Sequence, residues 1–249
     1  MKTSAMTWVI VCSTLAAMPC LRADEVSRAA IEKAVEAHGG KEKLAKLRAV
    51  RTKMKGTVLI NGNTGQFSAD ACRQLPDRSK TTIHLEIGDA KLTFVQVQNG
   101  KKAWSSVEGT TEELMDERLA EQQARTHQFQ VQSLLPLLND KAYELSALGE
   151  IKVNERPAAG VRAALKGHAD INLYFDKQNG LLLKTERRGL DLSQKEIVLE
   201  TFYREYKDFD GLKQPLKFVS HHDGKQYMEA EVTELRFEET IDESEFARP

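Results

Sequence analysis

The stretch Val50-Arg51-Thr52-Lys53-Met54-Lys55-Gly56-Thr57-Val58-Leu59-Ile60-Asn61-Gly62 decides the fold. Its even-numbered positions up to 60 are mainly apolar, and the odd-numbered positions up to 57 are basic or polar. A period of two predicts a β-strand with one buried and one wet face. The closing Asn-Gly tolerates the positive φ angles of a tight turn, so it predicts a hairpin.

The same signals recur along the chain. Further Asn-Gly or Asp-Gly pairs begin at positions 99, 179, 210 and 223. Alternating apolar positions mark five more strands, at Ile83/Leu85/Ile87, Ile171/Leu173/Phe175, Leu181/Leu183, Leu216/Phe218 and Met228/Ala230/Val232. Hairpins in succession predict an antiparallel meander, because parallel strands need a crossover helix between them.

Helical patterns interrupt the strands. Residues 26–35 are apolar at helical spacing until His38-Gly39-Gly40 stops the run, and 41–47 predicts a second short helix. Thr110-Thr111-Glu112-Glu113 resembles a capping box and predicts a helix start. Residues 129–138 form the most apolar segment after the leader, where Pro136 should end or kink the helix.

These elements predict an α+β fold, with a large curved antiparallel sheet forming a half-open barrel. The apolar face of such a sheet must be covered. We expect the N-terminal helix and the helical insertion to cover the concave face. The insertion either packs there as core or acts as a lid over a ligand, and pattern evidence favours packing.

The first 23 residues predict export. Lys2 precedes an apolar run, and small residues lead to Ala23 before Asp24, which is the layout of a secretory signal peptide. The run is too short to span a bilayer, and no later segment is long and apolar enough to span one either. We expect cleavage near Ala23 and a periplasmic protein. Lipid attachment at Cys20 is the alternative, which the preceding Ala17-Met18-Pro19 disfavours.

Composition narrows the function. The chain has 249 residues, with 36 basic against 37 acidic, so no basic excess points to nucleic acid. We expect residues 24–249 to form a single domain. After removal of the leader, Cys72 is the sole cysteine. A half-buried strand position is the favoured interpretation of Cys72 over a reactive thiol.

Catalytic and metal motifs are missing from the sequence. No nucleophile elbow, phosphate loop, zinc-protease motif or Cys-x-x-Cys occurs. Adjacent His221 and His222 should point to opposite faces of a strand, which disfavours a shared metal ion. The pair Arg187-Arg188 and the lysines near Arg51 are more typical of a solvated protein face than of an anion-binding site. We therefore expect no catalytic residue, no metal and no cofactor.

Several segments, in order, resemble a known family. These are His38-Gly39-Gly40-Lys41-Glu42-Lys43-Leu44, Leu173-Tyr174-Phe175-Asp176, Asn179-Gly180-Leu181-Leu182-Leu183, Tyr203-Arg204-Glu205-Tyr206-Lys207, Asp210-Gly211-Leu212-Lys213-Gln214-Pro215 and Ile241-Asp242-Glu243-Ser244-Glu245-Phe246. The set resembles the LolA-like outer-membrane lipoprotein-sorting proteins. The resemblance implies the half-barrel fold of the lipoprotein carrier and its receptor, with acyl chains sheltered on the concave face.

The leading hypothesis is therefore an exported, non-enzymatic carrier of lipid-modified or other apolar cargo, with acyl chains or a lipoprotein as ligand. Burial of each CH₂ contributes ~0.8 kcal/mol, so one acyl chain could supply useful affinity. The candidate lining residues are Val58, Ile60, Ile83, Leu85, Phe94, Leu134, Leu137, Leu173, Leu183 and Phe218. The alternative is a non-catalytic envelope module with a filled core that docks a protein partner. A hydrolase or metal enzyme is the third and least favoured class.

Overall fold

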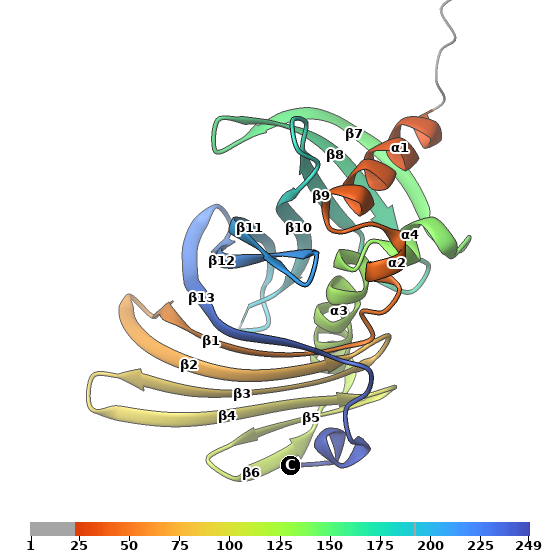
Figure 1. Ribbon diagram of the computed structural model, residues 1–249. Coiled ribbons are helices and arrows are strands. Elements are labelled where there is room, and N and C mark those ends of the chain that lie inside the picture. The colour runs from red at the N-terminus through yellow and green to blue at the C-terminus, as the bar shows by residue number, and fades with distance from the viewer. Residues whose placement is uncertain (1–22, 192) are drawn as a thin grey trace, which may run out of the picture.

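The computed structural model describes residues 23–191 and 193–249, so the predicted leader before Ala23 and its Cys20 lie outside the described residues. Thirteen strands form one antiparallel sheet in the order β6-β5-β4-β3-β2-β1-β13-β12-β11-β10-β9-β8-β7. The sheet curls without closing (Figure 1). The predicted fold class, a half-open barrel with helices at the N-terminus and in the middle of the chain, is confirmed.

The first half of the chain supplies six strands and two helices. The helices are α1 (Ala23–Ala37) and α2 (Lys41–Leu44). The strands are β1 (Ala49–Ile60), β2 (Asn63–Gln74), β3 (Arg78–Ile87), β4 (Ala90–Asn99), β5 (Lys102–Val107) and β6 (Thr110–Glu113). They form one side of the curled sheet, seen in orange to yellow-green in Figure 1.

The second half begins with α3 (Asp116–Gln132) and α4 (Leu135–Asn139). Seven strands follow: β7 (Glu144–Val153), β8 (Arg156–Ala164), β9 (Ile171–Asp176), β10 (Leu182–Leu190), β11 (Glu196–Phe209), β12 (Leu212–His222) and β13 (Lys225–Glu238). A 3₁₀ turn, η1 (Glu243–Phe246), follows β13. Because β1 pairs with β13, strands from the two ends of the chain meet in the middle of the sheet.

The predicted turns all occur between paired strands. Asn61-Gly62, Asp210-Gly211 and Asp223-Gly224 have positive φ at both residues, as the tight hairpin turn requires. The pairs at 99 and 179 have positive φ only at their glycines. The turn residues therefore identified five hairpins of the meander correctly.

The helix start predicted at Thr110–Glu113 is wrong. These four residues are strand β6, which pairs with β5. Glu108 and Gly109 both have positive φ and form a turn that the sequence signals did not reveal. Once that turn returns the chain, pairing with β5 satisfies the backbone of 110–113. Helix α3 begins at Asp116 instead.

The end of the long helix agrees better with the prediction. Helix α3 stops at Gln132, and Leu134 has a positive φ of 67°. Pro136 lies in the first turn of the separate helix α4, where its missing N–H costs nothing. The apolar segment 129–138 thus forms two helices at an angle to each other.

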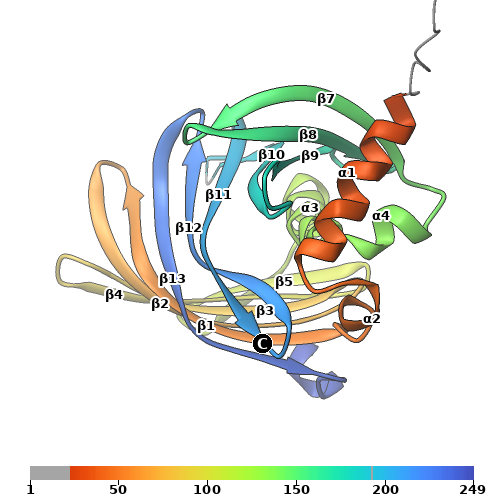
Figure 2. The ribbon, with the colours of Figure 1, turned by 45° about the horizontal axis from the view of Figure 1, so that its top comes forward.

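One half of the inner face of the sheet is packed against helices. We call the buried apolar residues of this half the helix-covered core. Leu134, Leu137 and Leu173 belong to it, with α1 residues such as Ile31, and each is at most 3% exposed. The full set is Ile31, Ala34, Val35, Leu44, Val131, Leu134, Leu137, Tyr143, Val161, Ala163, Ile171, Leu173, Phe175, Leu182 and Leu212. Helix α1 lies against β7, β8 and α4 (Figure 2).

The outer face carries a smaller core. Cys72 of β2 packs with Ala49, Val97, Ile241 and Phe246, and the last of these comes from η1. Cys72 is 5% exposed, and burial raises the pKa of its thiol. A buried thiol with a raised pKa is a poor nucleophile, so its surroundings are those of a structural strand residue, more deeply buried than expected.

Candidate functional site

An apolar surface remains on the inner face of the sheet beside α3. We call it the apolar patch. Its three buried large or branched members are Val58, Phe67 and Leu85, and Ile83 lies half-buried beside them. The complete set is Met54, Val58, Ile60, Phe67, Ala69, Ile83, Leu85, Ile87, Phe94, Phe218, Tyr227, Met228 and Ala230. It extends over β1 to β4, β12 and β13.

Strand register shows that this patch faces the inside. Ser79 of β3 hydrogen-bonds Thr126 of α3, so the side of β3 that carries Ser79 is the side that α3 lies on. Ile83 and Leu85 have the same parity as Ser79 and therefore the same face. Cross-strand pairs extend this face, because Ile83 lies opposite Phe94 and Leu85 opposite Phe67.

The helices cover only part of the inner face. Helix α3 has its main sheet contacts with β4, β5 and β10. Figure 1 shows it against one end of the strands, away from the β1–β2 and β3–β4 hairpins. Most large side chains of the patch stay half-buried. The expectation that helices roof the whole concave face is therefore corrected, since α1, α3 and α4 are committed to the other half.

The predicted lining residues separate into three groups. Val58, Ile60, Ile83, Leu85, Phe94 and Phe218 all lie in the apolar patch. Leu134, Leu137 and Leu173 instead fill the helix-covered core. Leu183 points to the opposite face, where it packs with Tyr174, and a register shift between Leu182 and Lys184 explains the change of parity. Sequence reasoning missed Phe67, Met228 and Tyr227, although the alternation of β2 and β13 carried the signal for the first two.

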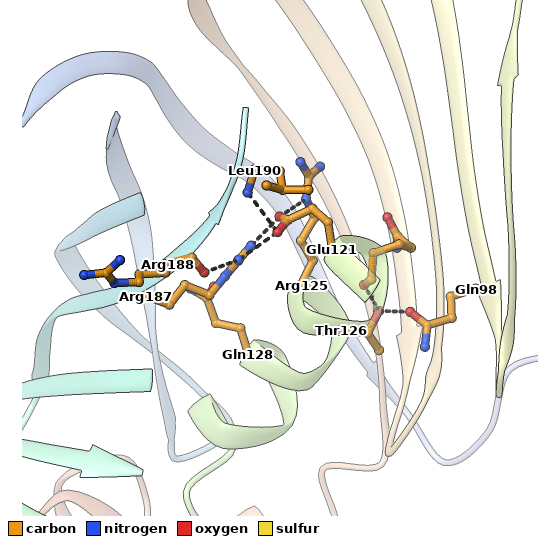
Figure 3. Close-up of polar contacts among 9 residues, drawn as sticks. Gln98, Glu121, Arg125, Thr126, Gln128, Arg187, Arg188 and Leu190 are labelled. Atoms are coloured by element: carbon orange, nitrogen blue, oxygen red, sulfur yellow. Dashed lines mark hydrogen bonds and ion pairs between the residues drawn. The ribbon is translucent and has the colours of Figure 1, made fainter. Parts of the chain in front are cut away.

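Polar contacts hold α3 inside the curve of the sheet. On one side, Thr126 donates to Gln98 Oε1 of β4 at 2.7 Å and lies 3.1 Å from Ser79 Oγ. On the other side, Gln128 of α3 donates to Thr185 Oγ1 of β10 at 3.1 Å. Figure 3 shows α3 between these two groups of strands. The helix is therefore fixed by side-chain hydrogen bonds, where the sequence suggested apolar packing.

The strongest of these contacts is a buried ion pair. Arg187 Nη2 of β10 lies 2.7 Å from Glu121 Oε1 of α3, and the two side chains are 4% and 10% exposed. Glu121 also accepts hydrogen bonds from Arg125 and from the backbone N–H of Leu190 (Figure 3). Desolvation raises the pKa of Glu121, but these partners outweigh it and the pKa lies below its usual value.

A second network links the helix to β11. The Tyr203 hydroxyl accepts from Gln132 Nε2 at 2.5 Å and lies 3.0 Å from Thr185 Oγ1. Burial raises the pKa of Tyr203, so its phenol stays neutral at physiological pH. The polar side chains that join α3 to β4, β10 and β11 are thus largely hydrogen-bonded to one another, which suits a structural role.

The histidine side chains of the described residues do not come together in a metal-binding arrangement. Within residues 23–191 and 193–249, no group of three or more His, Cys, Asp or Glu side chains is placed to bind a metal ion. The ring of His221 packs against Phe202, whereas that of His222 stacks on Tyr227 with centroids 3.8 Å apart. His127 stacks on His168 at 4.1 Å. Burial, with the nearby His168, lowers the pKa of His127 to about 4.

Two hollows on the described surface lie outside the apolar patch. One is on the outer face of β1 to β3 and β13, and several of its charged side chains, such as Arg51 and Glu245, are paired with each other. The other is beside the β9–β10 turn, around Arg156 and Asp176. None of the described helices is long and apolar enough to cross a membrane.

Comparison with known proteins gives a fold. No protein-family model matches the chain. The sequence of no curated protein matches it either. Solved structures do match. A LolA superfamily protein from Nitrosomonas europaea superposes with a TM-score of 0.57 at 9% identity, over 89% of this chain and 97% of that one.

Two further structures give the same result. A putative outer membrane lipoprotein-sorting protein domain from Vibrio parahaemolyticus has a TM-score of 0.55 at 12% identity, covering 90% of this chain and 97% of that one. A DUF1329 family protein from Desulfovibrio piger has a TM-score of 0.58 at 11% identity, covering 89% and 97%. The half-open barrel of this chain therefore has the fold of the LolA superfamily and of outer-membrane lipoprotein-sorting domains.

Proposed function

We propose that the protein is an exported, non-catalytic carrier that holds the acyl chain of its cargo against the apolar patch. The observation that carries this proposal is the patch itself. Several large apolar side chains share one inner face and remain half-buried. Apolar side chains that lie together on one face and are only partly covered can form a binding site for an apolar partner.

The fold supports the same function. Structures named for lipoprotein sorting and for the LolA superfamily share this architecture over most of their length. The leader predicted for residues 1–23 would deliver the chain to the periplasm, where such cargo has to cross water. Residues 24–249 would then act as a single carrier domain.

The physical basis of binding would be desolvation. Each CH₂ that leaves water contributes ~0.8 kcal/mol, so a chain of about ten such groups covers the cost of losing translational freedom. The six predicted lining residues that share the patch are Val58, Ile60, Ile83, Leu85, Phe94 and Phe218. We propose that these six residues contact the acyl chain, and that the four other predicted residues only stabilise the fold.

A binding assay with matched variants tests the proposal. We expect the purified protein to take up an uncharged apolar fluorescent dye and to carry lipid in native mass spectrometry. Ile83→Asn and Phe94→Asn place amides on the patch and should weaken dye binding about tenfold, because burial of an unpaired polar group costs about 1–3 kcal/mol. Lys55→Asn is the control, since Lys55 is exposed on the outer face of β1.

Two results would contradict the carrier. If the wild-type protein binds neither the dye nor lipid, the carrier function is rejected. Recovery of one stoichiometric protein without lipid would favour the envelope interaction module instead. The sheet offers such a module an edge in β7, whose residues Ser146–Lys152 are exposed and include Leu148 and Ile151.

A further inference from the structure

One cation stands alone on the inner face of the first four strands. The inward positions of β1 to β4 carry apolar, small or neutral polar side chains, and Arg73 of β2 is the only charged residue among those described there. The outward positions of the same strands carry many charges, including Lys53, Asp70 and Lys80. A lone charge on such a face calls for an explanation, because burial of an ion is costly.

The surroundings of Arg73 are all neutral. Its guanidinium carbon lies 3.7 Å from the centre of the Phe129 ring of α3. Its cross-strand neighbours are Ser79 of β3 and Val50 of β1. The phenol of Tyr203 from β11 is close enough to affect its pKa, which burial lowers to about 10. Arg73 therefore lies between α3 and the sheet, and it remains a cation at neutral pH.

Arg73 has no anionic partner. No ion pair or hydrogen bond joins its guanidinium to any described residue, and the buried Nε is left without an acceptor. The residue as a whole is half-buried, and Nε is its one guanidinium nitrogen that is both fully buried and unpaired, so the two terminal nitrogens keep some exposed surface. Its nearby counterpart Arg187 is satisfied by Glu121 and Gln128. Of these two inner arginines, Arg73 is the one whose donors remain available.

The face between Arg73 and the apolar patch is continuous. Along β2 the inward residues between Arg73 and Phe67 are Ala71 and Ala69, two small side chains that are 5% and 3% exposed and separate the cation from an aromatic ring of the patch. Six residues of strand span about 20 Å. One leaflet of a bilayer core is about 15 Å thick, half of its ~30 Å. The face is therefore long enough for one acyl chain.

We propose that the inner face binds an amphiphile with a single anionic headgroup, with the headgroup paired to Arg73 and the acyl chain laid along β2, from Arg73 towards Phe67 and the apolar patch. This proposal rests on the carrier function and defines its cargo class. A carboxylate or a phosphate supplies the acceptors that the guanidinium lacks, in the bidentate geometry that suits arginine. The predicted leader offers no substitute, because residues 1–22 contain Lys2 and Arg22 but no acidic residue.

Displacement of a bound apolar dye by three lipids tests the proposal. The competitors are oleate, its uncharged methyl ester and oleoyl lysophosphatidate. We expect the wild-type protein to bind the two anionic lipids at least about tenfold more tightly than the ester. Arg73→Met should remove that preference and leave ester binding unchanged, while Arg73→Lys should retain part of it. Lys55→Met, on the outer face of β1, is the matched control.

The headgroup source follows from the two anionic arms. If the Arg73→Met substitution weakens the binding of oleate alone, the natural headgroup is a carboxylate. If it weakens the binding of lysophosphatidate alone, the headgroup is a phosphate. Equal displacement by ester and anions, or an equal loss for all three lipids in Arg73→Met, would overturn the anionic subsite and leave the carrier intact. A protein that binds no dye would remove the carrier as well. A dimer that binds dye only after dissociation would assign the patch to a second copy of the chain.

Folding of the variant is checked separately. Arg73→Met replaces a half-buried cation that has no anionic partner among the described residues with an apolar side chain of similar length, so we expect its melting temperature to be no lower than that of the wild-type protein. Unchanged or raised stability together with lost anion preference identifies Arg73 as a binding residue.

Discussion

The helix-covered core and the apolar patch are built from the same residue types on the same face of one sheet, but they differ in what lies over them. Leu173 in the core is fully buried beneath the helical segments, whereas Ile83 in the patch is only half-buried. Packing with partners on both sides stabilises the fold, while packing on one side leaves a binding surface. Apolar side chains thus stabilise the fold in the helix-covered core and, in our proposal, bind cargo in the apolar patch.

The ion pair between α3 and β10 should have the largest effect on stability. Glu121→Ala removes the partner of buried Arg187 and leaves that cation unpaired. We expect a loss of about 3–5 kcal/mol in the free energy of unfolding, measured with urea. Glu196→Ala is the control, because the Arg188–Glu196 pair is exposed at 78% and 63% and should contribute under ~1 kcal/mol. Equal losses in the two variants would show that α3 is not anchored by this pair.

Truncation of one side chain in each region tests the comparison directly. Leu173→Ala opens a cavity in the helix-covered core and should cost about 2–5 kcal/mol. Ile83→Ala trims the half-buried patch and should cost about 1 kcal/mol, while weakening dye binding. Urea unfolding and dye titration of both variants give the four values needed. A patch truncation as costly as the core truncation would mean that the patch is a second packed core.

Acid should weaken the helix-covered side through His127. Its folded-state pKa of about 4 lies below the ordinary 6.5, so between these values the unfolded chain binds a proton that the folded chain does not. Stability is therefore complete above pH 6.5 and falls as the pH drops towards 4. The loss is at most about 3 kcal/mol, from 1.36 kcal/mol per pKa unit.

Thermal melts from pH 7 to pH 4 measure this loss. His127→Phe keeps a ring against Tyr143 and His168 and should reduce the slope. It should not abolish the slope, because burial also lowers the pKa of His38 and His222. His84→Phe, at an exposed outer position of β3, should leave it unchanged. An identical slope in all three proteins would exclude His127 as the source.

Local signals in the sequence predicted much of this fold. Alternation in 50–60 identified β1 and its inward face, and Asn61-Gly62 identified the turn that follows. These succeed because side-chain parity and positive φ are properties of a few consecutive residues. The same reasoning failed at Thr110–Glu113, where pairing with β5 overrode a helix-capping pattern. It also misplaced Leu183, because a bulge reversed the parity of β10.

The sequence by itself determined the antiparallel meander, the first helix, the lack of a familiar catalytic motif and six of the residues that share the apolar patch. Only the tertiary structure decided which apolar segments are covered, because the curl of the sheet brings α3 between strands that are far apart along the chain. It also decided that Arg187 meets Glu121, while Arg73 meets no carboxylate in the described part of the chain. Pairing of charges across a fold depends on where strands from both ends of the chain meet, and no local pattern encodes that.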